Sequence, residues 1–300
     1  MSSSRRLFTV VIASLCEGAR SELLKRACES VRAMAGDLDY SILVVANGSR
    51  VNSGVLEWLA TQRDIRVVRL RTGSHPLARR VGAELADTEF LGFVDDDDEL
   101  IPNTLAKKIA YFREHPEVDV LVTDGLSING SEVENIFAPF QARSPDLVET
   151  MMRVGWGAGA VTIRTARVDL AAFDTEIRHV EWTLTTLELA RHYKFGFLDE
   201  LTYRYYETTP NSLSKTEEHN FGEPRVWRRL CKSYAGTRYQ AITRRNFVTA
   251  CREVSWEFAR RGRLRDAWRL HLESLRPPGS LKSLAFSPRL LAASLRGLFA

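Results

Sequence analysis

The sequence predicts an α/β protein, with a mostly parallel central sheet that carries helices on both faces, and a helical appendage at its C-terminal end. Two observations predict this fold class. Apolar, β-rich runs alternate with segments of helical spacing as far as about residue 204, and the pattern after about residue 226 is helical only. A length of 300 residues is typical of two domains or of one large domain with an appendage.

Strands and helices alternate regularly over the first hundred residues. Continuous runs rich in Val, Ile and Leu are typical of parallel strands that are covered on both faces. The segments between them repeat apolar residues every three or four positions, which is the helical period. We expect strands at residues 7–13, 41–46, 65–70 and 90–94, and helices at residues 21–34, 55–61 and 77–86.

The pattern is less regular after residue 100, and it becomes wholly helical near the end. We expect further strands at residues 118–123, 160–164 and 195–204, with a helix near residues 181–193. Residues 129–145 and 208–224 lack periodicity and are predicted to be loops. Helices should fill residues 226–275, with a hairpin of two helices joined at Gly262, and the tail beyond Pro277-Pro278 is expected to be a separate piece.

Charge divides the chain into two parts. The formal net charge is +4, but residues 223–300 contain 17 Lys and Arg against 5 Asp and Glu, whereas residues 1–222 contain 25 against 33. The two parts should therefore meet different partners, or each other. We place the domain boundary between residues 222 and 223.

Several classes of protein are disfavoured by composition. No apolar run of the length that a spanning helix needs is present. The four cysteines form no Cys-x-x-Cys pair, so we expect reduced thiols in a cytoplasmic protein. The C-terminal arginines alternate with Trp227, Trp256 and Trp268 and form no known reader motif, so nucleic acid is not an expected partner.

Five acidic residues, Asp95 to Glu99, directly follow a predicted buried strand. Ligands of open α/β sheets bind beyond the carboxyl ends of the strands. Adjacent like charges repel one another unless a cation compensates them, and hard cations such as Mg²⁺ or Mn²⁺ prefer carboxylate oxygens. Alternate residues of an extended segment share a face, so Asp95 and Asp97 would face one site. The alternative is a solvated acidic turn before Pro102.

Four ordered segments of the chain carry a resemblance to a known family. They are Val10 to Ser14, Val44-Val45-Ala46-Asn47-Gly48-Ser49, Ala78-Arg79-Arg80-Val81-Gly82 and Val94 to Pro102. Their order and spacing resemble, over roughly residues 7–210, a family 2 glycosyltransferase of the bacterial, inverting type with the GT-A fold. The resemblance implies a GT-A domain over residues 1–222 and a basic helical region over residues 223–300.

The resemblance implies a metal-dependent, inverting transfer of sugar from a nucleotide-sugar donor to a glycan, lipid-linked or small-molecule acceptor, as in polysaccharide biosynthesis. The implied cofactor is Mg²⁺ or Mn²⁺. The implied metal ligands are Asp95 and Asp97, which form the Asp-x-Asp motif. The implied nucleotide-binding residues are Ser14, Glu17, Asn47, Arg79, Asp95 and Asp96.

The general base of an inverting transfer must reach the acceptor hydroxyl. In the family it is an acid of a Glu-Asp-Trp-type helix start, which here corresponds to Val180-Glu181-Trp182. We expect Glu181 to be the base and Asp98 to face the acceptor side or support the turn. The rival bases are Asp174, Glu176 and His179.

Two further segments carry weaker expectations. The small residues from Gly155 to Ala160 are predicted either to border the acceptor pocket, with Trp156 stacked on a sugar, or to form a tight turn with a core tryptophan. Glu207 stands near the position at which many family members have a metal-ligating histidine.

Three positions depart from the family pattern. Ala46 replaces the Asp that usually meets uracil, Arg80 replaces an Asn, and Val180 replaces the first acid. These changes put uridine recognition in doubt, and they leave open an inactive nucleotide-sugar-binding module. A sugar-phosphate nucleotidyltransferase is a third hypothesis. That class of enzyme needs a Gly-rich, basic phosphate loop after the first strand, and the loop from Ser14 to Arg20 counts against it because it has a single Gly and contains an acid.

The last residues suggest a short basic, amphipathic helix that starts at Ser287-Pro288. Leucines and arginines alternate along it, so it would lie on an anionic membrane or pack on the acidic half of the chain. The expected location is therefore the cytoplasm, with peripheral contact at the inner face of a membrane as one alternative.

Overall fold

The computed structural model describes residues 6–137, 146–154, 157–173, 176–177, 180–209, 217–278 and 280–298. They belong to two compact units. The first, which we call the sheet unit, comprises Met1–Glu176 and Leu189–Pro210. The second, the helical unit, comprises Ile177–Glu188 and Asn211–Ala300, so residues 177–188 and 211–222 fall on the helical side of the boundary expected at residue 222.

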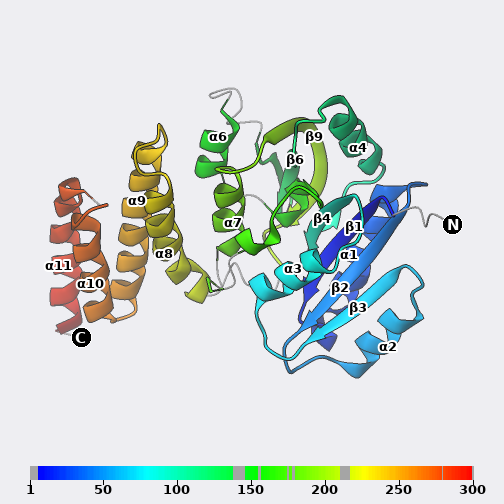
Figure 1. The fold of residues 1–300 in the computed structure, drawn as a ribbon. Helices are drawn as coiled ribbons and strands as arrows, with labels where there is room; N and C mark the ends of the chain where they lie inside the picture. The colour runs from blue at the N-terminus through cyan, green and yellow to red at the C-terminus, as the bar shows by residue number, and fades with distance from the viewer. Residues whose placement is uncertain are drawn as a thin grey trace. The chain divides into compact units, whose positions relative to one another are not determined.

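A single mixed sheet forms the centre of the sheet unit (Figure 1). The strand order is β3-β2-β1-β4-β8-β6-β9-β5, with β7 paired to β6. The neighbours β3, β2, β1 and β4 are parallel, as the apolar runs predicted, and this confirms the expected fold class. The strands are β1 (Phe8–Ser14), β2 (Tyr40–Asn47), β3 (Ile65–Leu70), β4 (Phe90–Asp95), β5 (Glu99–Leu100), β6 (Val120–Asn129), β7 (Glu132–Asn135), β8 (Val161–Arg164) and β9 (Phe195–Tyr206).

Helices connect the strands of the sheet unit. Three of them begin with side-chain caps, because Asn52 accepts a hydrogen bond from Val55 N, Ser74 accepts one from Leu77 N and Asp146 accepts one from Val148 N. The helices are α1 (Ser21–Ala35), α2 (Ser53–Thr61), α3 (His75–Glu84), α4 (Leu105–Glu114) and α6 (Leu147–Arg153), with short 3₁₀ turns η1 (Gly18–Arg20), η2 (Ala158–Ala160) and η3 (Leu170–Ala172).

The sheet changes direction between β1 and β4. From β1 the chain proceeds outward to β2 and β3, and it then returns to add β4 on the opposite side of β1. Ala13 and Asp95 are register partners at the carboxyl ends of these two strands. Such a switch point opens a crevice for ligands beyond the strand ends, and this places the acidic residues where the sequence predicted them.

Two predicted loops contain regular structure. The expectation of a loop at residues 129–145 is wrong for β7, which pairs with β6 through a hairpin at Gly130. All four residues of β7 are exposed, so it lacks the alternation that reveals a strand. The expected loop at residues 208–224 is wrong from Glu217 onward, where a polar helix begins.

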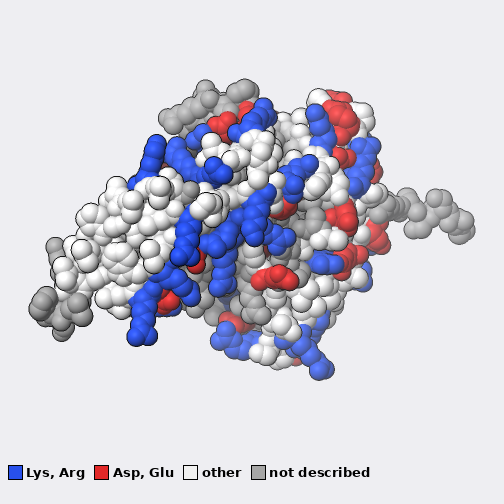
Figure 2. Space-filling model, turned by 60° about the vertical axis from the view of Figure 1, so that its left-hand side comes forward, with Lys and Arg blue, Asp and Glu red and all other residues white. Residues whose placement is uncertain are grey.

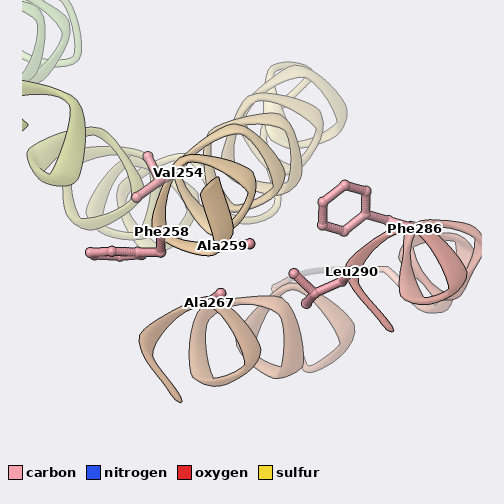
Figure 3. Close-up of a cluster of buried hydrophobic side chains, with 6 residues drawn as sticks. All are labelled: Val254, Phe258, Ala259, Ala267, Phe286 and Leu290. Carbon is pink, nitrogen blue, oxygen red and sulfur yellow. The ribbon is translucent and has the colours of Figure 1, made fainter. Parts of the chain in front are cut away.

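The helical unit consists of α8 (Glu217–Ser233), α9 (Gln240–Arg260), α10 (Leu264–Leu275), η5 (Leu281–Phe286), α11 (Ser287–Leu298) and most of α7 (Glu181–Leu189). The predicted hairpin is present, with Gly262 at φ +73° between α9 and α10. Phe286 and Leu290 pack into a core with Val254, Phe258 and Ala267 (Figure 3). The tail is therefore part of this unit, and the expectation of a separate piece is wrong.

Neither disulfides nor spanning helices contribute to the described structure. Cys16, Cys28, Cys231 and Cys251 are buried free thiols. Within the described ranges, no helix is both long and apolar enough to cross a membrane. The two units are therefore stabilised by their apolar cores and hydrogen bonds.

Candidate active site

The acidic cluster, Asp95 to Asp98, lies at the carboxyl end of β4. Asp95 ends the strand, and Asp98 N donates a hydrogen bond of 3.1 Å to Asp95 O in the turn that follows. Asp96, Asp97 and Asp98 are only 6%, 9% and 2% exposed. Burial of three adjacent carboxyl groups contradicts the solvated acidic turn that the sequence left open, because such a turn would leave them in water.

Arg79 compensates the first carboxylate of the cluster. It lies on the inner side of α3, is 5% exposed, and its Nη2 is 2.6 Å from Oδ1 of Asp95. His75, at the start of the same helix, is 4.0 Å from that oxygen. Burial raises the pKa of Asp95, but Arg79 and His75 outweigh burial and hold the pKa below its usual value.

Arg20 meets the next two carboxylates, and sequence analysis did not single it out. Its Nη2 is 2.5 Å from Oδ1 of Asp96 and 3.1 Å from Oδ2 of Asp97. Ser14, at the end of β1, donates a hydrogen bond of 2.5 Å to Oδ2 of Asp96. The position of Arg20 in the polar loop after the first strand could have indicated a place near the site. It was not a specific signal, because many loops contain an arginine.

The negative charge of the cluster exceeds what these arginines compensate. Burial, followed by repulsion from Asp95 and Asp96, raises the pKa of Asp97. Burial, followed by Asp95 and Asp97, raises the pKa of Asp98 well above its usual value. A cation bound between these carboxyl groups would favour their ionised forms and so lower both pKa values.

One oxygen of Asp98 stands out among these groups. Oδ1 accepts a hydrogen bond of 3.1 Å from Tyr206 N, whereas Oδ2 is buried and has no hydrogen-bond partner among the residues that the structure describes. A buried polar atom without a partner is costly, so it is the kind of group that a ligand satisfies.

The small residues after α6 make room for a tyrosine. Tyr203 is fully buried, and its hydroxyl accepts a hydrogen bond of 3.2 Å from Gly157 N. A Cβ at Gly157 would lie 2.9 Å from the Tyr203 ring, and one at Gly159 would lie 2.7 Å from Tyr203 Cβ. Packing on Tyr203 therefore explains both glycines, while Gly155 and Trp156 lie outside the described residues.

A second feature is a pocket beyond the ends of β1, β2 and β3. Its volume is about 190 Å³. Glu17 is paired there with Arg50, whose Nη2 lies 3.1 Å from Glu17 Oε1. The pocket is lined by Leu15, Glu17, Asn47, Gly48, Ser49, Arg50, Arg71 and Gly73.

Asn47 holds the walls of this pocket together. Its amide nitrogen donates a 3.4 Å hydrogen bond to Ser14 O, and its amide oxygen accepts a 3.1 Å bond from Ser74 N. Asn47 is 1% exposed and neighbouring Ala46 is fully buried. The asparagine therefore joins the ends of β1 and β2 to the start of α3, and both of its amide atoms bind backbone.

Glu181 is the first residue of α7, in the helical unit, and it is 9% exposed. Val180 precedes it with φ +60°, a left-handed conformation that costs a β-branched residue energy and is often retained for function. Of the rival bases, Glu176 is exposed, while Asp174 and His179 fall outside the described residues.

Two other residues singled out in the sequence have partners elsewhere. Glu207 accepts a hydrogen bond from the Ser127 hydroxyl on β6. Arg80 pairs with Glu84 at 2.7 Å, one turn along α3. Neither contact involves the acidic cluster, and both are typical of surface pairs.

The acidic cluster fits a hard divalent cation that shares its ligands with a substrate. In the described part of the chain, no group of three or more His, Cys, Asp or Glu side chains is arranged to hold a metal ion. Mg²⁺ and Mn²⁺ sites with phosphate substrates use one or two protein carboxylates. Asp95 and Asp97 offer such oxygens, and the orphaned oxygen of Asp98 adds a third acceptor nearby in the same turn.

Comparison with protein families gives a match over the first half of the chain. Residues 9–149 match the model of Glycosyl transferase family 2, a range that includes the acidic cluster, Arg79 and the pocket residues. The match confirms the resemblance that the four ordered segments indicated. No curated protein matches the sequence.

Solved structures similar to this one include several of TarS from S. aureus. TarS 1-349 in complex with UDP-GlcNAc has 19% identity and a TM-score of 0.61, with 82% of this chain and 72% of that chain covered. TarS 1-349 in complex with UDP has 18% identity and a TM-score of 0.61, covering 97% and 88%. At these identities the likeness shows a common fold, the GT-A fold that the sequence predicted.

Proposed function

This chain contains a family 2 glycosyltransferase domain with the GT-A fold, and from that premise we propose that it is a metal-dependent, inverting glycosyltransferase. It would move a sugar from a nucleotide-sugar donor to a glycan, lipid-linked or small-molecule acceptor. The observation that carries this proposal is the buried acidic cluster at the switch point of the sheet. The acidic groups of the cluster outnumber the arginines that pair with them.

The donor would lie across the ends of β1, β2 and β4. The pocket bordered by Glu17, Gly48 and Arg71 would take the nucleoside, and the diphosphate would extend from there toward Asp95. Similar structures of TarS were solved with UDP and UDP-GlcNAc, which supports a nucleotide-sugar donor. Because Ala46 replaces the usual Asp and Asn47 is bound to backbone, other groups must select the base.

Asp95 and Asp97 would hold Mg²⁺ or Mn²⁺. When bound, the ion supplies compensation for the charge that develops on the departing diphosphate. Arg79 and Arg20 hold the first three carboxylates in fixed positions, so little reorganisation is needed when donor arrives. Ser14 fixes Asp96 in the same way from the end of β1.

Glu181 would accept the proton of the acceptor hydroxyl. Its carboxylate stands at the start of α7 and is a group that can take a proton from a hydroxyl within hydrogen-bonding reach. Attack from the face opposite the diphosphate would invert the anomeric centre. Asp98 would bind a polar group of the acceptor or donor through its unpartnered oxygen.

An inactive nucleotide-sugar-binding module is the second candidate, and the replacements Ala46, Arg80 and Val180 favour it. The nucleotidyltransferase hypothesis is weaker, because the loop from Ser14 to Arg20 lacks the glycines that would wrap a triphosphate.

A cytoplasmic location agrees with the four free thiols, which are typical of a reducing compartment. An acceptor linked to a lipid would require the enzyme to work at the inner face of a membrane.

A thermal-shift screen tests the proposal. UDP-, dTDP- and GDP-sugars are each added with and without Mn²⁺, and a ligand that binds the folded state raises the melting temperature. We expect one nucleotide class to stabilise the protein only with Mn²⁺, and the same donor to be consumed when an acceptor mixture is present. Stabilisation without consumption would favour the inactive module, and no response to any donor would contradict both.

A further inference from the structure

Helix α11 is apolar on two opposite sides. Its inner side places Leu290 and Ala293 against α9 and α10. Its outer side exposes Pro288, Leu291, Ala292 and Leu295, which follow the helical spacing i, i+3, i+4 and i+7. A helix on the surface of a protein normally presents polar residues on this side. The outer stripe therefore needs an explanation other than packing within the chain.

The turn that precedes α11 exposes two further leucines. Leu281 and Leu284 are three residues apart in η5, and side chains at this spacing lie on the same edge of a 3₁₀ helix. Of the six large hydrophobic side chains that are exposed in the described residues, four are found here. They are Leu281 at 72%, Leu284 at 53%, Leu291 at 52% and Leu295 at 49%. We call these four residues the leucine face; such concentration marks an interaction surface.

The charge of the same segment is wholly basic. Residues 280–300 contain Lys282, Arg289 and Arg296 and no acidic residue. Lys282 and Arg289 are exposed, and the guanidinium of Arg289 stacks 4.1 Å above the Trp256 ring. Figure 2 shows Lys and Arg side chains on the molecular surface together with Asp and Glu and large uncharged areas.

Charge distinguishes between the possible occupants of the leucine face. A second copy of this chain would bring the same basic segment against itself, which like-charge repulsion opposes. A surface with negative headgroups over an apolar layer complements both properties, because leucines enter the acyl boundary while Lys and Arg meet the phosphates. Insertion of the leucines and attraction of the basic residues to the headgroups are each weak alone, and stable peripheral binding needs two such contributions together.

We propose that η5 and α11 form a peripheral binding face for anionic lipid bilayers, with the leucine face inserted and Lys282 and Arg289 at the headgroups. Leu290 is not part of this face, because it is fully buried in the protein core. The inserting residues are the outward Leu291 and Leu295, together with the leucines of η5.

Vesicle sedimentation of the full chain tests the proposal. The probes are vesicles of phosphatidylcholine alone and of phosphatidylcholine mixed with phosphatidylglycerol. We expect the wild type to bind the mixed vesicles preferentially and to dissociate as salt increases. The affinity of the double variant Leu291→Gln/Leu295→Gln for the mixed vesicles should be lower by about tenfold or more, since each change removes an inserting side chain. Lys282→Glu should reduce the preference for phosphatidylglycerol.

Matched controls separate this effect from damage to the fold. Val133→Gln changes a side chain that is 56% exposed on β7 of the sheet unit, and Arg113→Glu reverses an exposed charge on α4. Both should bind vesicles like the wild type. The melting temperature of each variant verifies folding. The readout does not involve sugar transfer, so its failure leaves the proposed enzymatic function standing.

Three results would overturn the membrane proposal. The first is equal binding of the wild type and the Leu291→Gln/Leu295→Gln variant, and the second is no binding of the wild type to phosphatidylglycerol vesicles. The third is a dimer in sedimentation velocity that the same double variant dissociates, without vesicle binding, which would assign the leucine face to a second copy.

Discussion

Arg79 and Asp95 join helix α3 to the end of strand β4 through an ion pair of 2.6 Å that is largely shielded from water. The two residues come from different family motifs, and the pair connects the helix start that borders the pocket to the acidic cluster. Its geometry explains why an arginine in this helix would matter to a donor that also contacts Asp95.

Replacement of Arg79 by Lys should weaken donor binding by about tenfold, because lysine keeps the charge but loses the planar fork that contacts two oxygens at once. Calorimetric titration with the stabilising nucleotide measures the change. The control is Arg80→Lys, next to it on α3, whose partner Glu84 is on the surface. Equal losses in the two variants would contradict the assignment.

Asp97→Asn should abolish sugar transfer, since the amide cannot supply the charge that a divalent cation requires. Turnover is measured as nucleotide release from the donor. Asp37→Asn, in an exposed turn of the sheet unit, is the matched control and should keep full activity. Unchanged turnover in Asp97→Asn would remove Asp97 from the site.

Glu181→Gln should lower the transfer rate by about two to four orders of magnitude, as expected for loss of a general base, while donor binding stays unchanged. The comparison variant is Glu176→Gln, which alters the exposed rival acid. If the transfer rate fell in Glu176→Gln and not in Glu181→Gln, Glu176 would be the general base instead of Glu181.

Lys108 should make stability depend on pH. It is 2% exposed on α4, with Nζ 3.4 Å from Gly159 O, and burial lowers its pKa from 10.5 to about 7. Between these two values the unfolded chain binds the proton and the folded chain does not, so stability rises with pH across that window and is level below it. The slope contributed by one proton is at most about 1.4 kcal/mol per pH unit.

Lys108→Met should remove this slope and raise stability near neutral pH, as measured by urea unfolding at a series of pH values. Lys107→Met is the control, because the neighbouring Lys107 is exposed and pairs with Glu200. If the wild type and Lys108→Met show the same pH profile, Lys108 is charged in the folded protein.

Gly82→Ala should destabilise the sheet unit by about 1–3 kcal/mol, the usual cost of overpacking. A Cβ at this position would lie 2.4 Å from a methyl group of Val11 on β1, so α3 would have to move away from the sheet. The variant Val11→Ala/Gly82→Ala creates the missing space and should be more stable than the sum of the single changes predicts. Simple additivity of the two losses would contradict this contact.

Sequence patterns predicted the sheet unit well where the signal was local. The buried strands and the capped helices carry their own periodicity and end signals, so β1 to β4 were predicted within two residues at each end. Strand β7 and the start of α8 were missed, because their residues are polar and gain their structure from pairing and packing with distant segments.

The candidate site was predictable in part. The acidic run and the family motifs identified Asp95 to Asp98 and Arg79 from the sequence. Arg20 and Tyr206 were not predicted, because their contacts with Asp96 and Asp98 span 76 and 108 residues of chain. The structural role of Asn47 was likewise not predicted, since its partners Ser14 and Ser74 lie at the end of β1 and at the start of α3, far from it in the sequence.

Calorimetric titration of UDP, dTDP and GDP into the wild-type protein, in Mn²⁺ and in EDTA, tests whether the acidic cluster holds a metal-bound nucleotide. We expect at least one nucleotide to bind about tenfold or more tightly with Mn²⁺, and Asp97→Asn to remove this difference. Equal affinity in Mn²⁺ and EDTA for every nucleotide that binds, or no binding of any of them, would contradict a metal-dependent donor site.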